Sequence, residues 1–164
     1  MDRFKRATGL NAIEEGSVVW NDWKRAQVTE LLKLLVGKAR SIRPDIQVSA
    51  TGCMYYERAL HEAFQDWPLW VNSGFVDFVT IMNYSPDPVR YERWNAVART
   101  KVKDLRKLYF GVGAYKLMRS PEIFETEYRS CEKAGVGLCA VFHYGSLLEN
   151  AALERPLFVK ESQA

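Results

Sequence analysis

The chain has 164 residues, and its 23 basic and 20 acidic side chains leave a formal net charge of +3. This length predicts one domain with a substantial core. The mixed charge argues against a nucleic-acid partner, for which the only support is a pI near 8.7. No apolar run approaches the ~20 residues that span a bilayer. Residues 1–6 are basic but have no apolar segment after them, so they do not resemble a secretory signal and predict a cytoplasmic chain.

The three cysteines indicate neither a metal site nor a disulfide framework. Cys53, Cys131 and Cys139 are odd in number and have no CxxC spacing. We expect free thiols in a reducing compartment. The sequence predicts no metal ion and no cofactor.

The first half of the chain alternates helix and strand signals. Residues 1–19 have the composition of an irregular loop. Asp22 is the predicted N-cap of a long amphipathic helix that ends before Pro44. Its apolar stripe, spaced for one buried helix face, consists of Val28, Leu31, Leu32, Leu35, Val36, Ala39 and Ile42. A short strand over residues 46–51 and a helix over residues 55–64 follow.

The second half repeats this alternation of helix and strand signals. Asp66 is a predicted N-cap for a short helix with Pro68 in its first turn. The further predicted elements are strands over residues 75–84, 107–115 and 137–144, and helices over residues 91–105 and 121–133.

These elements predict an α/β fold of parallel β/α units connected by right-handed crossovers. Four units correspond to half of a (β/α)8 barrel. We expect a single domain over residues 1–164, with the four units in residues 20–148 and a helical or loose tail in residues 149–164.

Parallel β/α units place their chemistry at the carboxyl ends of the strands. The candidate positions there are Thr51, Asn83, Tyr84, Tyr115, His143 and Tyr144. Aromatic rings beside amide and hydroxyl groups suit a sugar, which offers C–H faces for stacking and hydroxyls for hydrogen bonds. Gly111 and Gly113 could open space for such a ligand. The alternative is that the tyrosines cap the barrel mouth and the glycines relieve crowding within it.

Strand alternation separates two faces of the strand over residues 75–84. If Tyr84 points into the barrel, so do Phe78, Thr80 and Met82, and Asp77 points to the helices as a structural partner. His61 is expected to be structural. Glycoside hydrolysis needs two carboxylates, but the nearest acids, Asp87 and Glu57, do not form a convincing pair. The catalytic residues therefore remain unknown.

Several segments resemble, in order and spacing, the bacterial glycosyl-hydrolase-like proteins of the family 10 glycosylhydrolase type, formerly a domain of unknown function. They comprise residues 20–25, the helix up to Pro44, the strand containing Ser49, residues 65–67 with Trp70, and residues 76–84, 111–115 and 137–147. The Met82-Asn83-Tyr84 strand end also resembles the sixth strand of chitinase-like barrels.

The resemblance covers residues 4–148 and implies a (β/α)8 barrel acting on glycans, with some members cleaving denuded peptidoglycan strands. It matches strands five to eight only. The fourth strand, whose acid is expected to contribute to catalysis, would precede Met1. The resemblance therefore carries over Asn83 and Tyr84, then Tyr115 and Tyr144, as substrate-binding positions, and no catalytic acid. It leaves export of full-length members open.

The leading hypothesis is a half-barrel that binds or hydrolyses bacterial, peptidoglycan-type glycans and is inactive without its first half. The alternative is a non-catalytic carbohydrate-binding or assembly module. The expected partners are an oligosaccharide and either a second copy of the chain or the missing half-barrel, because four strands leave two open edges.

Overall fold

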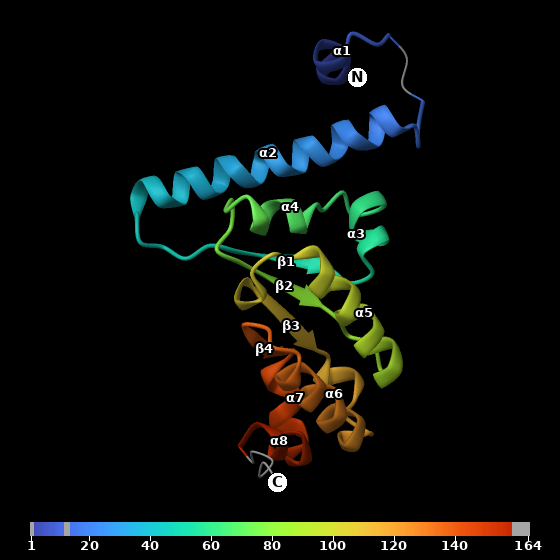
Figure 1. Cartoon of the computed structure of the whole chain (residues 1–164), viewed down its shortest axis with the longest axis vertical. Coiled ribbons are helices and arrows are strands. Elements are labelled where there is room, and N and C mark those ends of the chain that lie inside the picture. Colours follow the sequence, from blue (N-terminus) through green and yellow to red (C-terminus); the bar gives the residue numbers. More distant parts are fainter. Residues whose placement is uncertain (1, 12–13, 159–164) are drawn as a thin grey trace.

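The computed structural model describes residues 2–11 and 14–158, and its centre is a four-stranded parallel sheet (Figure 1). The strands lie in the order β1-β2-β3-β4. Their bounds are β1 Ser49–Cys53, β2 Phe78–Met82, β3 Leu108–Val112 and β4 Leu138–Val141. The order and direction confirm the predicted fold class, a chain of parallel β/α units equivalent to half of a barrel.

Helices alternate with these strands. The α-helices are α1 Asp2–Thr8, α2 Val18–Ile42, α3 Tyr56–His61, α4 Trp67–Asn72, α5 Pro88–Lys101, α6 Pro121–Lys133, α7 Tyr144–Glu149 and α8 Arg155–Phe158. Three short 3-10 helices, η1 Leu105–Lys107, η2 Ala114–Lys116 and η3 Ala151–Leu153, complete the described elements. No helix in the described ranges is long and apolar enough to cross a membrane.

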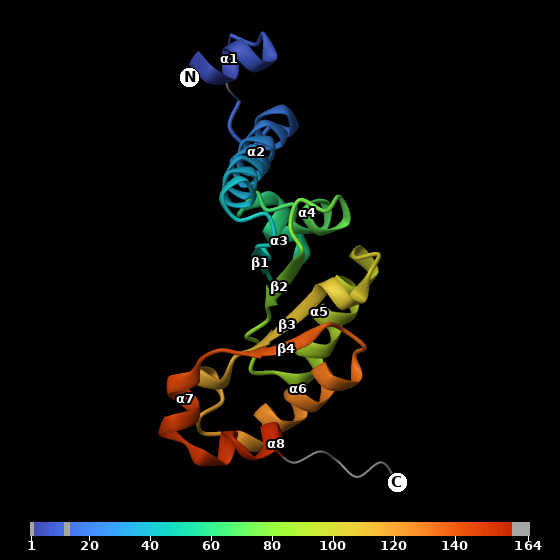
Figure 2. The ribbon, with the colours of Figure 1, turned by 90° about the vertical axis from the view of Figure 1, so that its left-hand side faces the viewer.

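The sheet has one covered and one open face. Val79, Ile81 and Phe110 are fully buried on the helix side, and Figure 2 shows α5 and α6 beside β3 and β4. Phe78, Thr80 and Met82 alternate with the buried residues of β2 and are only half-buried. This alternation confirms the predicted parity of β2.

Asp77 is a structural partner of a helix, as the alternation predicted. Arg40 on α2 donates from Nη2 to both Asp77 carboxylate oxygens, at 3.1 and 3.0 Å. The Val48 amide donates to the same carboxylate at 2.7 Å. The hydrogen bond from the Val48 amide contributes most to lowering the pKa of Asp77, and those from Arg40 add to it. Together they outweigh partial burial, which alone would raise this pKa.

The N-terminal expectations need two corrections. Residues 2–8 form α1 rather than a loop, because Phe4 packs edge-on against Trp20 and Trp23 on α2, with ring centroids 5.1 and 5.5 Å apart. This contact supports a helix too short to persist alone. The N-cap of α2 is Ser17, which accepts from the Trp20 amide, and not Asp22.

The apolar stripe of α2 is only partly covered. Val36 is buried and Leu32 packs against the core. Leu31, Leu35 and Ile42 remain 57, 62 and 73 % exposed. The stripe therefore packs against the core through Val36 and Leu32 and leaves a strip of apolar surface uncovered.

The prediction of three free thiols is wrong. Cys131, in the last turn of α6, and Cys139 on β4 form a disulfide, with Cα atoms 6.0 Å apart. The turn at Gly135, where φ is +69°, returns the chain into β4 and brings the two residues within bridging distance. Only Cys53 is a free cysteine.

Candidate functional site

Four aromatic rings gather beyond the carboxyl ends of β2, β3 and β4. Tyr84 stacks on Phe142 at a centroid distance of 5.3 Å, and Tyr115 meets Tyr84 edge-on at 5.7 Å. His143 lies parallel to Tyr115 at 6.3 Å. Tyr115 and Phe142 are 39 and 50 % exposed. We call Tyr84, Tyr115, Phe142 and His143 the aromatic cluster; it presents ring faces and edges to solvent where barrel chemistry is expected.

Two glycines of β3 and its end make this cluster possible. A Cβ on Gly113 would lie 2.9 Å from Tyr84 Cβ, and one on Gly111 would lie 3.0 Å from Tyr84 Cε1. Both glycines therefore make room for the Tyr84 ring. The space that they open is filled by Tyr84 and not left for a ligand, which favours the crowding alternative for these two positions.

The structure places Asn83 away from the aromatic cluster. The side chain is fully buried, and Nδ2 donates to the Tyr91 carbonyl at 3.0 Å and to Asn95 Oδ1 at 2.9 Å. Its Oδ1 accepts from the Ser85 amide at 3.4 Å. Asn83 therefore anchors α5 to the end of β2 and has no surface for a substrate.

The other predicted positions are exposed. Tyr144 begins α7 and is 71 % exposed, next to His143. Thr51 lies within β1 on the open face, opposite Thr80 in the register. Thr51 therefore belongs to the open sheet face below the strand ends, apart from the aromatic cluster.

A groove beside the aromatic cluster contains residues that the sequence did not reveal. It lies at the ends of β1 and β2 and is lined by Cys53, Met54, Tyr55, Arg58, Met82, Tyr84, Ser85, Pro86, Arg90 and Trp94. Tyr55, from the β1–α3 connection, packs against Trp94 of α5 at 6.2 Å. Arg58 and Arg90 come from the first turns of the helices that follow β1 and β2. The positions of Arg58 and Arg90 in the sequence could have indicated this, because in parallel β/α units the first helical turn after each strand lies near the carboxyl end of the sheet.

A comparison with protein-family models identifies the chain. The model described as glycosyl hydrolase-like 10 matches residues 1–130. The chain belongs to the glycosyl hydrolase-like 10 family. Searches of curated proteins and of solved structures found no match. The family match includes Tyr84, Tyr115 and the groove, and it ends within α6, before Phe142 and His143.

The carboxylates of this glycosyl hydrolase-like chain lie apart from the groove. The groove lining contains neither aspartate nor glutamate. Asp87 caps α5, accepting from the Val89 and Arg90 amides at 3.0 and 3.2 Å. Glu57 is exposed on α3 and lies 3.6 Å from His61. Neither acid lines the groove, so the described residues that line it offer no pair of carboxylates for glycoside hydrolysis.

One further carboxyl group is unusual, but it lies on the helix side. Glu127 on α6 is fully buried, and neither of its carboxyl oxygens has a hydrogen-bond partner among the described residues. Burial, and secondarily the charge of Asp87, raises its pKa to about 8. Glu127 is therefore protonated at neutral pH inside the α5–α6 interface.

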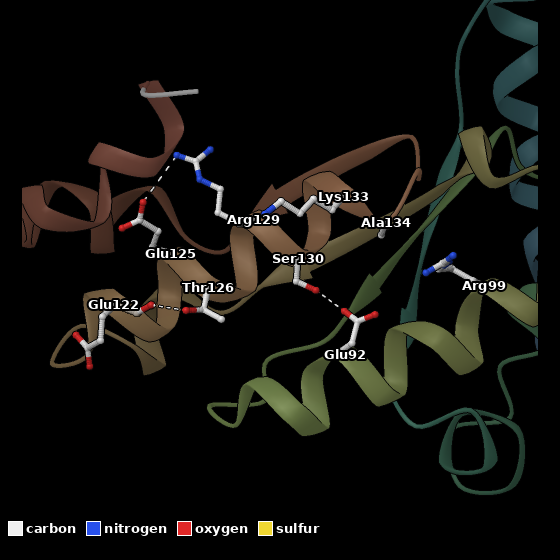
Figure 3. A pocket seen from close by; sticks show the side chains of 9 residues that line it. All are labelled: Glu92, Arg99, Glu122, Glu125, Thr126, Arg129, Ser130, Lys133 and Ala134. Atoms are coloured by element: carbon white, nitrogen blue, oxygen red, sulfur yellow. Dashed lines mark hydrogen bonds and ion pairs between the residues drawn. The ribbon is translucent and has the colours of Figure 1, made fainter. Parts of the chain in front are cut away.

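A broad hollow outside the barrel mouth has a different character (Figure 3). It lies between α5 and α6 and is lined mainly by charged side chains. Ser130 donates to Glu92, and Arg129 lies 3.8 Å from Glu125. No aromatic residue lines it. We therefore place the candidate glycan site at the strand ends. Among the described residues, no group of three or more histidine, cysteine, aspartate or glutamate side chains could hold a metal ion.

Proposed function

We propose that this glycosyl hydrolase-like chain is a glycan-binding half-barrel, with its site at the carboxyl ends of β2, β3 and β4. The aromatic cluster carries this proposal. Tyr84 and Phe142 present stacked rings, Tyr115 presents an edge, and His143 adds ring nitrogens. Flat apolar faces beside polar tips match the alternating C–H and hydroxyl surfaces of a pyranose. A bacterial, peptidoglycan-type glycan is the substrate class that family membership favours.

The chain on its own is expected to bind glycans without cleaving them. General acid–base transfer alone typically contributes 10²- to 10⁴-fold to a rate, about the scale lost when the carboxylates are absent. Because no acid lines the groove, turnover of chitin or peptidoglycan fragments should not exceed that of buffer. A turnover lost on Asp87→Asn or Glu57→Gln would contradict this expectation. The second candidate function, a non-catalytic carbohydrate or assembly module, is favoured by the same missing acids.

The open sheet face supports a partner. Phe78 stacks on Tyr109 at 4.4 Å, and Leu138 is 60 % exposed on the outer strand. The outer edges of β1 and β4 carry unpaired backbone groups. We expect a second copy of the chain, or a separate four-unit half-barrel, to cover this face.

The Cys131–Cys139 disulfide is informative about the cellular compartment of the protein. Disulfides persist in oxidising compartments and are rare in the cytosol. The disulfide therefore favours an oxidising compartment over the cytoplasm.

Calorimetry with chitotetraose and with a peptidoglycan glycan fragment tests the binding proposal. Tyr84→Ala should weaken binding by ~1–3 kcal/mol, because it removes an aromatic contact and a hydrogen-bonding hydroxyl. Tyr115→Ala is the second variant, since its more exposed ring can be removed with less risk to the fold. Phe158→Ala, at an 80 % exposed ring on α8, is the matched control. Unchanged affinity in folded Tyr84 and Tyr115 variants would overturn the assignment.

A further inference from the structure

The lining of the groove at the ends of β1 and β2 contains basic side chains and no acidic one. The basic residues are Arg58 from α3 and Arg90 from α5. Tyr55 and Trp94 form its aromatic side, with ring centroids 6.2 Å apart. Tyr84 is shared between this groove and the aromatic cluster. A glycan bound at the cluster can therefore extend one sugar further into the groove.

Arg90 is positioned for a ligand. Its guanidinium lies over the Trp94 ring, 5.8 Å from the centroid. Within the described residues, its side chain makes no ion pair with any carboxylate, and its Asp87 neighbour is occupied with capping α5. A cation–π contact over the face of an indole does not use the N–H groups of the guanidinium, which can therefore donate to an anion.

Arg58 stands at the facing rim. Its Nε donates to Glu62 Oε2 at 3.1 Å, one turn along α3. That contact orients the side chain, while its two terminal nitrogens make no hydrogen bond in the described part of the chain. The groove thus offers two guanidinium groups, one over the Trp94 ring and one hydrogen-bonded to Glu62.

We propose that this groove binds a carboxylate-bearing sugar unit of the glycan, with Arg90 and Arg58 donating to the carboxylate and the aromatic side formed by Tyr55 and Trp94 contacting the sugar ring. The proposal rests on the glycan-binding function proposed above and names the chemical class of the sugar. Guanidinium forks match carboxylate geometry and give charge-assisted hydrogen bonds. The carboxylate can belong to the ring, as in a uronic acid, or to an ether substituent, as in N-acetylmuramic acid.

Two matched ligand pairs test the proposal by calorimetry or by ligand-observed NMR. The first pair is tetragalacturonate and its methyl ester. The second is the disaccharide of N-acetylglucosamine and N-acetylmuramic acid with a free or an amidated carboxyl group. Arg58 and Arg90 are exposed, and exposed ion pairs contribute modestly to binding, so the free acid should bind about three- to ten-fold tighter in at least one pair. The pair that shows the preference identifies the source of the carboxylate. The preference should also shrink as salt is raised.

Arg90→Gln and Arg58→Gln should each reduce the ratio of affinities for the acid and for its neutral partner. Arg93→Gln is the control, because Arg93 lies on the same helix but does not line this groove. Equal affinity for acid and neutral ligand in both pairs would overturn the carboxylate assignment and leave glycan binding standing. Binding of none of the four ligands would overturn the proposed function itself. Tighter binding of a short single-stranded oligonucleotide than of either acid, with loss on Arg90→Gln, would also refute the proposal.

Discussion

The buried carboxyl of Glu127 should make the stability of the fold depend on pH, and Glu127→Gln should remove that dependence. The residue is fully buried on α6, and its oxygens have no hydrogen-bond partner among the described residues. Its pKa is raised from 4.5 to about 8, chiefly by burial. The folded protein therefore retains a proton that the unfolded chain releases at much lower pH.

The sign and size of the effect follow from proton linkage. Where the folded state binds more protons than the unfolded state, the free energy of unfolding falls as the pH rises. Well below pH 4.5 the carboxyl is protonated in both states, so it contributes no pH dependence; between 4.5 and about 8 the loss of stability accumulates. At ~1.4 kcal/mol per pH unit the loss approaches roughly 5 kcal/mol as an upper value, or about 3 kcal/mol at pH 7.

Urea denaturation of the wild type and of Glu127→Gln at pH values from 4.5 to 9, at one protein concentration, measures this pH-dependent loss of stability. Glutamine has the shape of protonated glutamate but does not titrate, so the variant should match the wild type in acid and exceed it by several kcal/mol above pH 8. Glu122→Gln, at an exposed position in the first turn of the same helix, controls for the change of residue type. A stability difference between Glu127→Gln and wild type that stays constant with pH would refute the reasoning.

Two further substitutions and one measurement of mass have defined expected outcomes. Gly113→Ala would bring a Cβ to 2.9 Å from Tyr84 Cβ, so it should cost ~1–3 kcal/mol in chemical denaturation and weaken glycan binding, whereas unchanged values would contradict the packing argument. Asp77→Ala removes the acceptor of the Val48 amide and of Arg40 and should cost about 1 kcal/mol at pH 7. Because the folded-state pKa of Asp77 is lowered, that cost should vanish as acid protonates the carboxylate; a cost independent of pH would refute this. Light scattering should show a homodimer, and a stable mass near the 18.9 kDa of one chain would rule it out.

The repetitive architecture was predictable because its signals are local. The alternation in β2 correctly separated Val79 and Ile81 from Phe78, Thr80 and Met82. Asp66 was recognised as a cap, and its carboxylate accepts from the Leu69 amide. Periodicity and capping depend on neighbours a few residues away, so one sequence suffices to find them.

The features that the sequence missed depend on contacts between distant segments. Asn83 follows an apolar strand just as Tyr84 does, and only the packing of α5 shows that it is buried. Trp94 lies on the helix predicted over residues 91–105 and Arg90 immediately precedes it, and the periodicity does not show that both residues line the groove. The helix α1 exists because Phe4 meets Trp20, a contact that local propensity does not contain.

Glycan binding and covering of the open sheet face should be coupled, because they share residues. Met82 is the last open-face residue of β2 and also lines the groove, two residues before Tyr84. A partner that packs on Phe78, Thr80 and Met82 therefore contacts Met82, which also lines the groove. If the partner orders Met82 and the Tyr84 ring, it raises the affinity of the chain for the glycan. A bound glycan then strengthens association with the partner by the same factor. The glycan affinity of the chain alone should then be lower than that of the assembly in which a partner covers the open face, and calorimetry on the two species would measure the difference.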